Sequence, residues 1–140
     1  MKLVYPTFIK EAKDYWLVYV PDMEIFTQGH DFYDAIEMAR DAIGMTAITI
    51  DDLDQEYPAA SDTAGAMAKA KKDADENLDF SDATLTFVDV DTVAYKNKIR
   101  NRSVKKNCTI PAWLNDKAEQ AGINFSRVLQ DALIEIVGAN

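Results

Sequence analysis

The sequence predicts an α+β protein made of a mixed N-terminal domain and a small C-terminal module of one strand and two helices. Three observations lead to this prediction: β-forming runs near both ends of residues 1–91, apolar residues at helical spacing between them, and a change in charge near residue 95. Residues 1–95 hold 20 Asp and Glu against 7 Lys and Arg, whereas residues 96–140 hold 4 against 8. We therefore expect domains over 1–91 and 103–140, joined by a basic linker or short helix over 92–102.

Three strands are expected to open the N-terminal domain. Residues 2–10 carry β-forming side chains, although Pro6 indicates an edge strand or a bulge. Residues 15–20 (YWLVYV) are almost wholly β-branched or aromatic, and they follow a polar turn, so they should pair with the first strand as a hairpin. A short third strand is expected over 25–27, after the turn signal Pro21-Asp22.

Helices and a last strand complete this domain. Asp31 can cap a helix that runs to about Thr49, because apolar residues recur there at helical spacing. After an acidic loop over 51–62, Ser61 can cap a short Ala-rich helix ending near Lys71, whose weak apolar face predicts loose packing. Residues 83–90 alternate as a strand. The order β-β-β-α-(α)-β predicts one sheet with a helix on one face.

The C-terminal module begins with a strand over 104–110 whose one face is entirely polar, formed by Lys105, Asn107 and Thr109. A capped helix over 92–99, starting at Asp91, should precede it. Pro111 stops the strand, and a first helix over 112–121 should end at Gly122 in the left-handed conformation. Either Asn124 or Ser126 can cap the second, strongly amphipathic helix.

One strand and two helices in so short a segment cannot close a hydrophobic core, and the strand would have an unpaired edge. Both problems disappear if two copies pair strand to strand. The runs KNCTIPAWL and GINFSRVLQ resemble a ribbon–helix–helix module. The resemblance implies a homodimer whose two-stranded ribbon enters the major groove of DNA, with higher oligomers possible.

In that arrangement Lys105, Asn107 and Thr109 would face base edges, since Lys suits guanine, Asn suits adenine and Thr offers a hydroxyl or a methyl group. The start of the second helix would hold a phosphate. Residues expected near the DNA backbone are Arg102, Asn124, Ser126 and Arg127. The competing interpretation is a helical hairpin docked on the N-terminal sheet, in which the polar strand face is merely solvated.

The N-terminal runs YWLVYVPD, FTQG and DAIEMARDAIG, with TFVDVD further on, resemble the HicB antitoxin family. One departure is that Glu24-Ile25 stand where the family usually has Gly-Cys. The resemblance implies a partial RNase H-like fold without a working active site. It also implies a small, basic, mRNA-cleaving toxin of the HicA type as partner, and operator DNA that the antitoxin represses.

Candidate toxin-binding residues follow from position and charge. Tyr15 and Trp16 start the second strand beside a polar turn and are expected as aromatic anchors, although core packing is the competing interpretation. Acidic residues on the first helix are further surface candidates: Asp34, Glu37 and Asp41. A domain with a net charge of −13 suits a basic partner.

Enzymatic chemistry has few candidate residues. Cys108 and His30 are the only residues of their types, which argues against zinc clusters and against Cys/His or Ser/His catalysis. We expect no catalytic residues, metal or cofactor. A magnesium-dependent nuclease using Asp89 and Asp91 is the enzymatic alternative. A stand-alone ribbon–helix–helix transcription regulator with a ligand-sensing N-terminal domain is the other alternative.

The lack of a signal peptide or a membrane-length apolar run leads us to expect a cytoplasmic protein.

Overall fold

The computed structural model describes residues 1–138 and divides the chain into two compact units, Met1–Arg102 and Ser103–Asn140. The N-terminal unit contains the strands β1 (Lys2–Glu11), β2 (Trp16–Val20), β3 (Ile25–Gly29) and β4 (Thr84–Asp91), and the helices α1 (Phe32–Asp52), α2 (Thr63–Lys72) and α3 (Thr92–Arg100). A single 3-10 turn, η1 (Pro21–Met23), joins β2 to β3. The C-terminal unit contains α4 (Ala112–Gln120) and α5 (Phe125–Val137). None of the helices in residues 1–138 is both long and apolar enough to cross a membrane.

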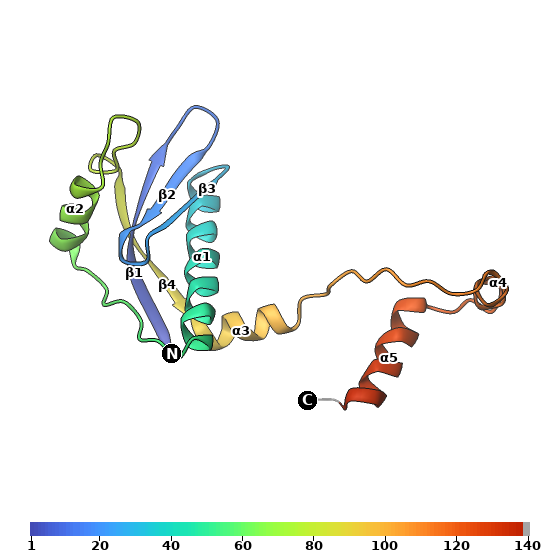
Figure 1. Cartoon of the computed structure of the whole chain (residues 1–140). Helices are drawn as coiled ribbons and strands as arrows, with labels where there is room; N and C mark the ends of the chain where they lie inside the picture. The colour runs from blue at the N-terminus through green and yellow to red at the C-terminus, as the bar shows by residue number, and fades with distance from the viewer. Residues whose placement is uncertain (139–140) are drawn as a thin grey trace. The chain divides into compact units, whose positions relative to one another are not determined.

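The four strands form one antiparallel sheet in the order β3-β2-β1-β4. Helices α1 and α2 lie on opposite sides of this sheet (Figure 1). On the α1 side, alternate strand residues such as Tyr5, Val18 and Val88 pack against buried residues of the helix. The α+β fold is confirmed, but the sheet carries a helix on both faces and not on one.

Helix α2 is packed tightly, contrary to the expectation from its weak apolar face. Ala66 and Ala70 are fully buried against Phe8 and Tyr19 of the sheet. Small side chains allow a close approach of helix and sheet, and a count of large apolar residues overlooks this. The N-cap of α2 is also not the expected Ser61. Asp62 caps the helix by accepting a hydrogen bond from Gly65 N at 2.8 Å, and Ser61 instead donates to Asp22.

Pro6 lies within a strand that is central in the sheet, so the expectation of an edge strand or bulge was wrong. The pairing of β1 with β4 extends from Lys2 to Ile9, but its pairing with β2 begins only at Phe8. Because Thr92 N donates to Met1 O, the odd-numbered residues of β1 bond to β4 and the even-numbered ones face the other side. The missing N–H of Pro6 therefore faces a region where β2 has already ended.

The helix caps follow the sequence closely. The carboxylate of Asp31 accepts from Asp34 N at 2.7 Å, and Asp91 accepts from Val93 N and Ala94 N at the start of α3. Asn124 caps α5 by accepting from Arg127 N at 3.1 Å, and Gly122 has a φ of 69°. Helix α1 continues three residues beyond its expected end, to Asp52.

The expected strand over 104–110 is not formed in the single chain. These residues have no secondary structure and are exposed. A strand needs a neighbour to complete its backbone hydrogen bonds, and no other segment among residues 103–138 supplies one.

Candidate nucleic-acid interface and partner surfaces

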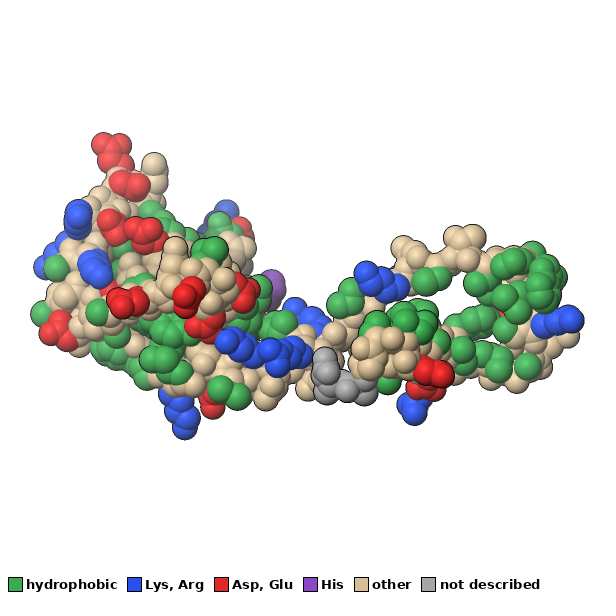
Figure 2. All heavy atoms as spheres, turned by 60° about the horizontal axis from the view of Figure 1, so that its bottom comes forward, with side chains coloured by type: hydrophobic (Ala, Val, Ile, Leu, Met, Phe, Trp, Pro, Cys, Tyr) green, Lys and Arg blue, Asp and Glu red, His purple; other side chains and the backbone are tan. Residues whose placement is uncertain are grey.

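The C-terminal unit has no buried residue among 103–138. Its apolar side chains gather on the surface of the two helices (Figure 2). They border a groove of about 390 Å³ lined by Cys108, Ile110, Leu114, Ala118, Ile123, Phe125, Val128, Leu129 and Ala132. Contiguous exposed apolar surfaces of this kind often mark sites of interaction with another molecule.

The polar strand residues lie outside this groove. Cys108 and Ile110 line it, whereas Lys105, Asn107 and Thr109 do not and are exposed. In an extended chain alternate side chains point to opposite faces, so one face of 105–109 is free to meet a ligand.

The start of α5 presents exposed backbone and polar side chains. Asn124 caps it, Ser126 is exposed, and Arg127 forms an exposed ion pair with Asp131 at 3.4 Å. Arg102 is exposed at the end of the N-terminal unit. The first N–H groups of such a helix can bind an anion.

The aromatic toxin-binding candidates have different environments. Trp16 is half-buried and packs edge to face on Phe32, with ring centroids 5.6 Å apart. It belongs to the core between the sheet and α1. Tyr15 lies in the turn before β2 and is 40% exposed.

The acidic candidates already have structural partners. Asp34 accepts from His30 N at 2.8 Å, and Glu37 pairs with Arg40. Asp41 accepts from the Tyr95 hydroxyl at 2.7 Å. Burial and this bond raise the pKa of Tyr95. Sequence reasoning did not single out the exposed aromatic groups of Tyr33 on α1, Phe26 on β3 and Phe87 on β4. Strand alternation alone could have placed Phe26 on the face opposite Ile25.

The nuclease candidates serve the fold. Asp89 interacts with Arg40 of α1, and Asp91 caps α3. Among residues 1–138, no group of three or more His, Cys, Asp or Glu side chains comes together in a way that would hold a metal ion.

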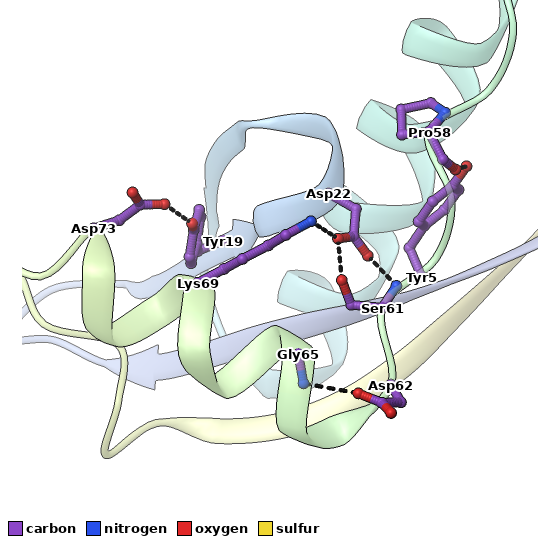
Figure 3. Close-up of polar contacts among 9 residues, drawn as sticks. All are labelled: Tyr5, Tyr19, Asp22, Pro58, Ser61, Asp62, Gly65, Lys69 and Asp73. Carbon is purple, nitrogen blue, oxygen red and sulfur yellow. Dashed lines mark hydrogen bonds and ion pairs between the residues drawn. The ribbon is translucent and has the colours of Figure 1, made fainter.

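A buried carboxylate joins η1 to the segment before and within α2 (Figure 3). Asp22 accepts from Ser61 N at 2.7 Å, from Ser61 Oγ at 2.6 Å and from Lys69 Nζ at 2.5 Å. Burial alone would raise the pKa of Asp22, but the hydrogen bonds from Lys69 and Ser61 outweigh it and lower the pKa. Tyr5 donates to Pro58 O at 2.7 Å nearby. A hollow of about 410 Å³ lies beside this cluster, and the oxygens of Asp22 are already occupied by protein donors.

Comparisons with known proteins agree across both units. The family model described as "HicB_like antitoxin of bacterial toxin-antitoxin system" matches residues 5–132. A toxin–antitoxin complex from Streptococcus pneumoniae contains a chain 26% identical to this one, with a TM-score of 0.56, covering 96% of this chain and 99% of that one. The antitoxin HicB of Burkholderia pseudomallei is 20% identical, with a TM-score of 0.51 and coverage of 97% and 99%, and this likeness concerns the fold. No curated protein sequence matches the chain. Because the family match extends over nearly the whole sequence, the chain belongs to the HicB-like antitoxin family of bacterial toxin–antitoxin systems.

Proposed function

We propose that this antitoxin binds and neutralises a small, basic, mRNA-cleaving toxin of the HicA type, and that it represses its own operon by binding operator DNA. The observation that carries the proposal is the family match over residues 5–132, which includes parts of both units. The similarity to a chain of the S. pneumoniae toxin–antitoxin complex supports a toxin as the partner. The protein acts by binding and has no catalysis of its own.

The N-terminal unit is the toxin-binding part, with a partial RNase H-like arrangement. Its sheet order and the placement of α1 are compatible with that fold. The acidic excess of residues 1–95 favours binding to a basic, RNA-binding surface and competition with RNA for it.

The C-terminal unit is a ribbon–helix–helix module that dimerises. A second copy would cover the apolar groove along α5, and its 104–110 segment would supply the missing strand partner. Within this dimer Lys105, Asn107 and Thr109 contact bases. Arg102, Ser126, Arg127 and the Asn124-capped end of α5 contact phosphates.

Toxin neutralisation is tested by expressing the small protein encoded beside this chain's gene, with and without the chain. We expect that protein alone to arrest growth and to cleave mRNA. When the full chain is co-expressed, growth should resume and the mRNA should stay intact. A chain that binds operator DNA and leaves the cleavage unchanged would be a stand-alone regulator, and the antitoxin proposal would fail.

Base recognition is tested at Asn107. We expect Asn107→Ala to weaken binding to the operator by about 1–3 kcal/mol and to relax the preference at one base pair, because a bidentate contact is lost. Asn97→Ala, an exposed asparagine on α3, is the matched control and should leave operator binding unchanged. Competition binding with operators substituted at each position measures both effects. An equal loss on all sequences would assign Asn107 to phosphate and refute base reading.

A further inference from the structure

The two edges of the sheet differ in how well they are covered. At β4, Arg40 Nε donates to the backbone carbonyl of Asp89 at 3.0 Å, and the same guanidinium lies 3.2 Å from the Asp89 carboxylate. Arg40 therefore occupies an outward-facing carbonyl that an added strand would need. Edge strands without such protection are ready to pair with another chain.

The β3 edge is open. The pairing of Phe8 with Tyr19 uses one side of β2, so Val18 faces β3 and bonds to Thr27. The backbone N–H and C=O groups of Phe26 and Gln28 consequently point away from the sheet. No side chain or loop among residues 1–138 bonds to them.

An apolar groove lies along this open edge. It has a volume of about 190 Å³ and is lined by Leu17, Val18, Phe26, Thr27, Gln28, Leu78 and Phe80. The Phe26 ring stacks on Tyr19 with centroids 4.7 Å apart, yet its side chain remains 60% exposed. A rigid, exposed aromatic ring beside a groove is the kind of anchor found at the centre of protein interfaces.

The segment that supplies one wall of the groove is strongly acidic. Residues 73–82, which supply Leu78 and Phe80, hold five Asp and Glu and no Lys or Arg. Lys10 of β1 pairs with Asp82 at 2.8 Å, and Asp73 accepts from the Tyr19 hydroxyl. The excess of negative charge favours a cationic occupant over a second copy of this acidic unit.

We propose that the β3 edge is where the toxin docks: a cationic, extended segment of the toxin adds as a fifth strand, with an apolar side chain in the groove beside Phe26. Backbone hydrogen bonds to Phe26 and Gln28 would give affinity, and the groove would give specificity. This inference rests on the proposed toxin-binding function and assigns it a surface.

The test uses the full chain with the protein encoded beside its gene, and two pairs of matched variants. Phe26→Ala removes the anchor, and Phe87→Ala removes a 49% exposed phenylalanine from the other edge strand. Gln28→Pro removes an outward-facing N–H without breaking a bond to β2, and Phe87→Pro does the same on β4. We expect the β3 variants to weaken toxin binding by roughly 30-fold, and the β4 variants to leave it unchanged. Operator binding by all four reports that the chain remains folded.

Hydrogen exchange gives a second measurement that does not depend on the variants. On toxin binding, the amides of Phe26 and Gln28 should become protected, and that of Phe87 should not. Equal toxin affinity for the β3 and β4 variants would overturn the docking surface while leaving the antitoxin function in place. A smaller oligomer caused by the β3 variants, with toxin binding unchanged, would assign the edge to a second copy and also overturn it. If the unmodified chain does not bind the toxin, the proposed function itself fails.

Discussion

At the scale of single residues, Asp22 shows how one carboxylate holds in place the connection between α1 and α2. Its side chain has no exposed surface, and its three donors come from Ser61 and Lys69, which lie 39 and 47 residues away in sequence. The hydrogen bonds keep the carboxylate ionised despite its burial. Because charge-assisted hydrogen bonds are strong, they also hold the segment before α2 against the end of β2. Helix α2 in turn leads into residues 73–82, the acidic segment that supplies Leu78 and Phe80 to the β3 groove.

Asp22→Asn should lower the stability of the N-terminal unit by about 1–3 kcal/mol at pH 7. Because the pKa of Asp22 is lowered in the folded state, its stabilisation is present above the ordinary carboxyl pKa of about 4 and is lost as the pH falls through the lower, folded value. The unmodified chain should therefore lose more stability than the variant between pH 7 and pH 3. Urea unfolding followed by Trp16 fluorescence, in a Trp113→Phe background, measures this. Asp14→Asn, in an exposed turn, is the control, and an equal pH dependence of Asp22→Asn and the unmodified chain would contradict the account.

At the scale of elements, α3 belongs to the N-terminal unit because it packs on α1. Gly44 makes this possible: a Cβ at that position would lie 2.7 Å from the ring of Tyr95. The ring is buried there, and its hydroxyl reaches Asp41. Helix α3 is therefore fixed to the sheet domain, up to the start of the C-terminal unit.

Gly44→Ala should destabilise the N-terminal unit by about 1–3 kcal/mol, since the added methyl group overpacks the contact with Tyr95. In an exposed helix the same change would stabilise by up to about 1 kcal/mol. A double-mutant cycle with Tyr95→Ala separates the two effects by urea unfolding. The cost of Gly44→Ala should vanish in the Tyr95→Ala background. An unchanged cost there would locate the strain elsewhere.

Local signals predicted most elements, because caps and alternation act over a few residues. Asp31 and Asp91 cap the helices that they were expected to cap, and Asn124, one of two candidates, caps α5. The errors concern contacts that are distant in sequence. The tolerance of Pro6 depends on where β2 ends, and the burial of Ala66 depends on the sheet beneath it. Strand alternation could have placed Phe26 on the face opposite Ile25, but its ring contact with Phe80 joins segments that are distant in sequence.

At the scale of the whole molecule, the two units differ in what completes them. The N-terminal unit has buried clusters on both faces of its sheet. Among residues 103–138 the C-terminal unit has none, and in the dimer proposed above its folding would be coupled to association. Binding of toxin by one unit and DNA by the other would then be separable by substitutions in either unit.

Leu129→Glu should test this coupling, because Leu129 lines the apolar groove of the C-terminal unit. A charge buried without a partner in the dimer should weaken dimerisation by about 100-fold or more. Gln130→Glu places the same charge on the neighbouring, exposed residue of α5 and should leave the dimer intact. Light scattering across a concentration series measures association, and operator and toxin binding are measured on the same samples. We expect Leu129→Glu to lose operator binding and to keep toxin binding. If it remained dimeric and bound the operator normally, the groove would not be the dimer interface, and the unpaired 104–110 segment would need another partner.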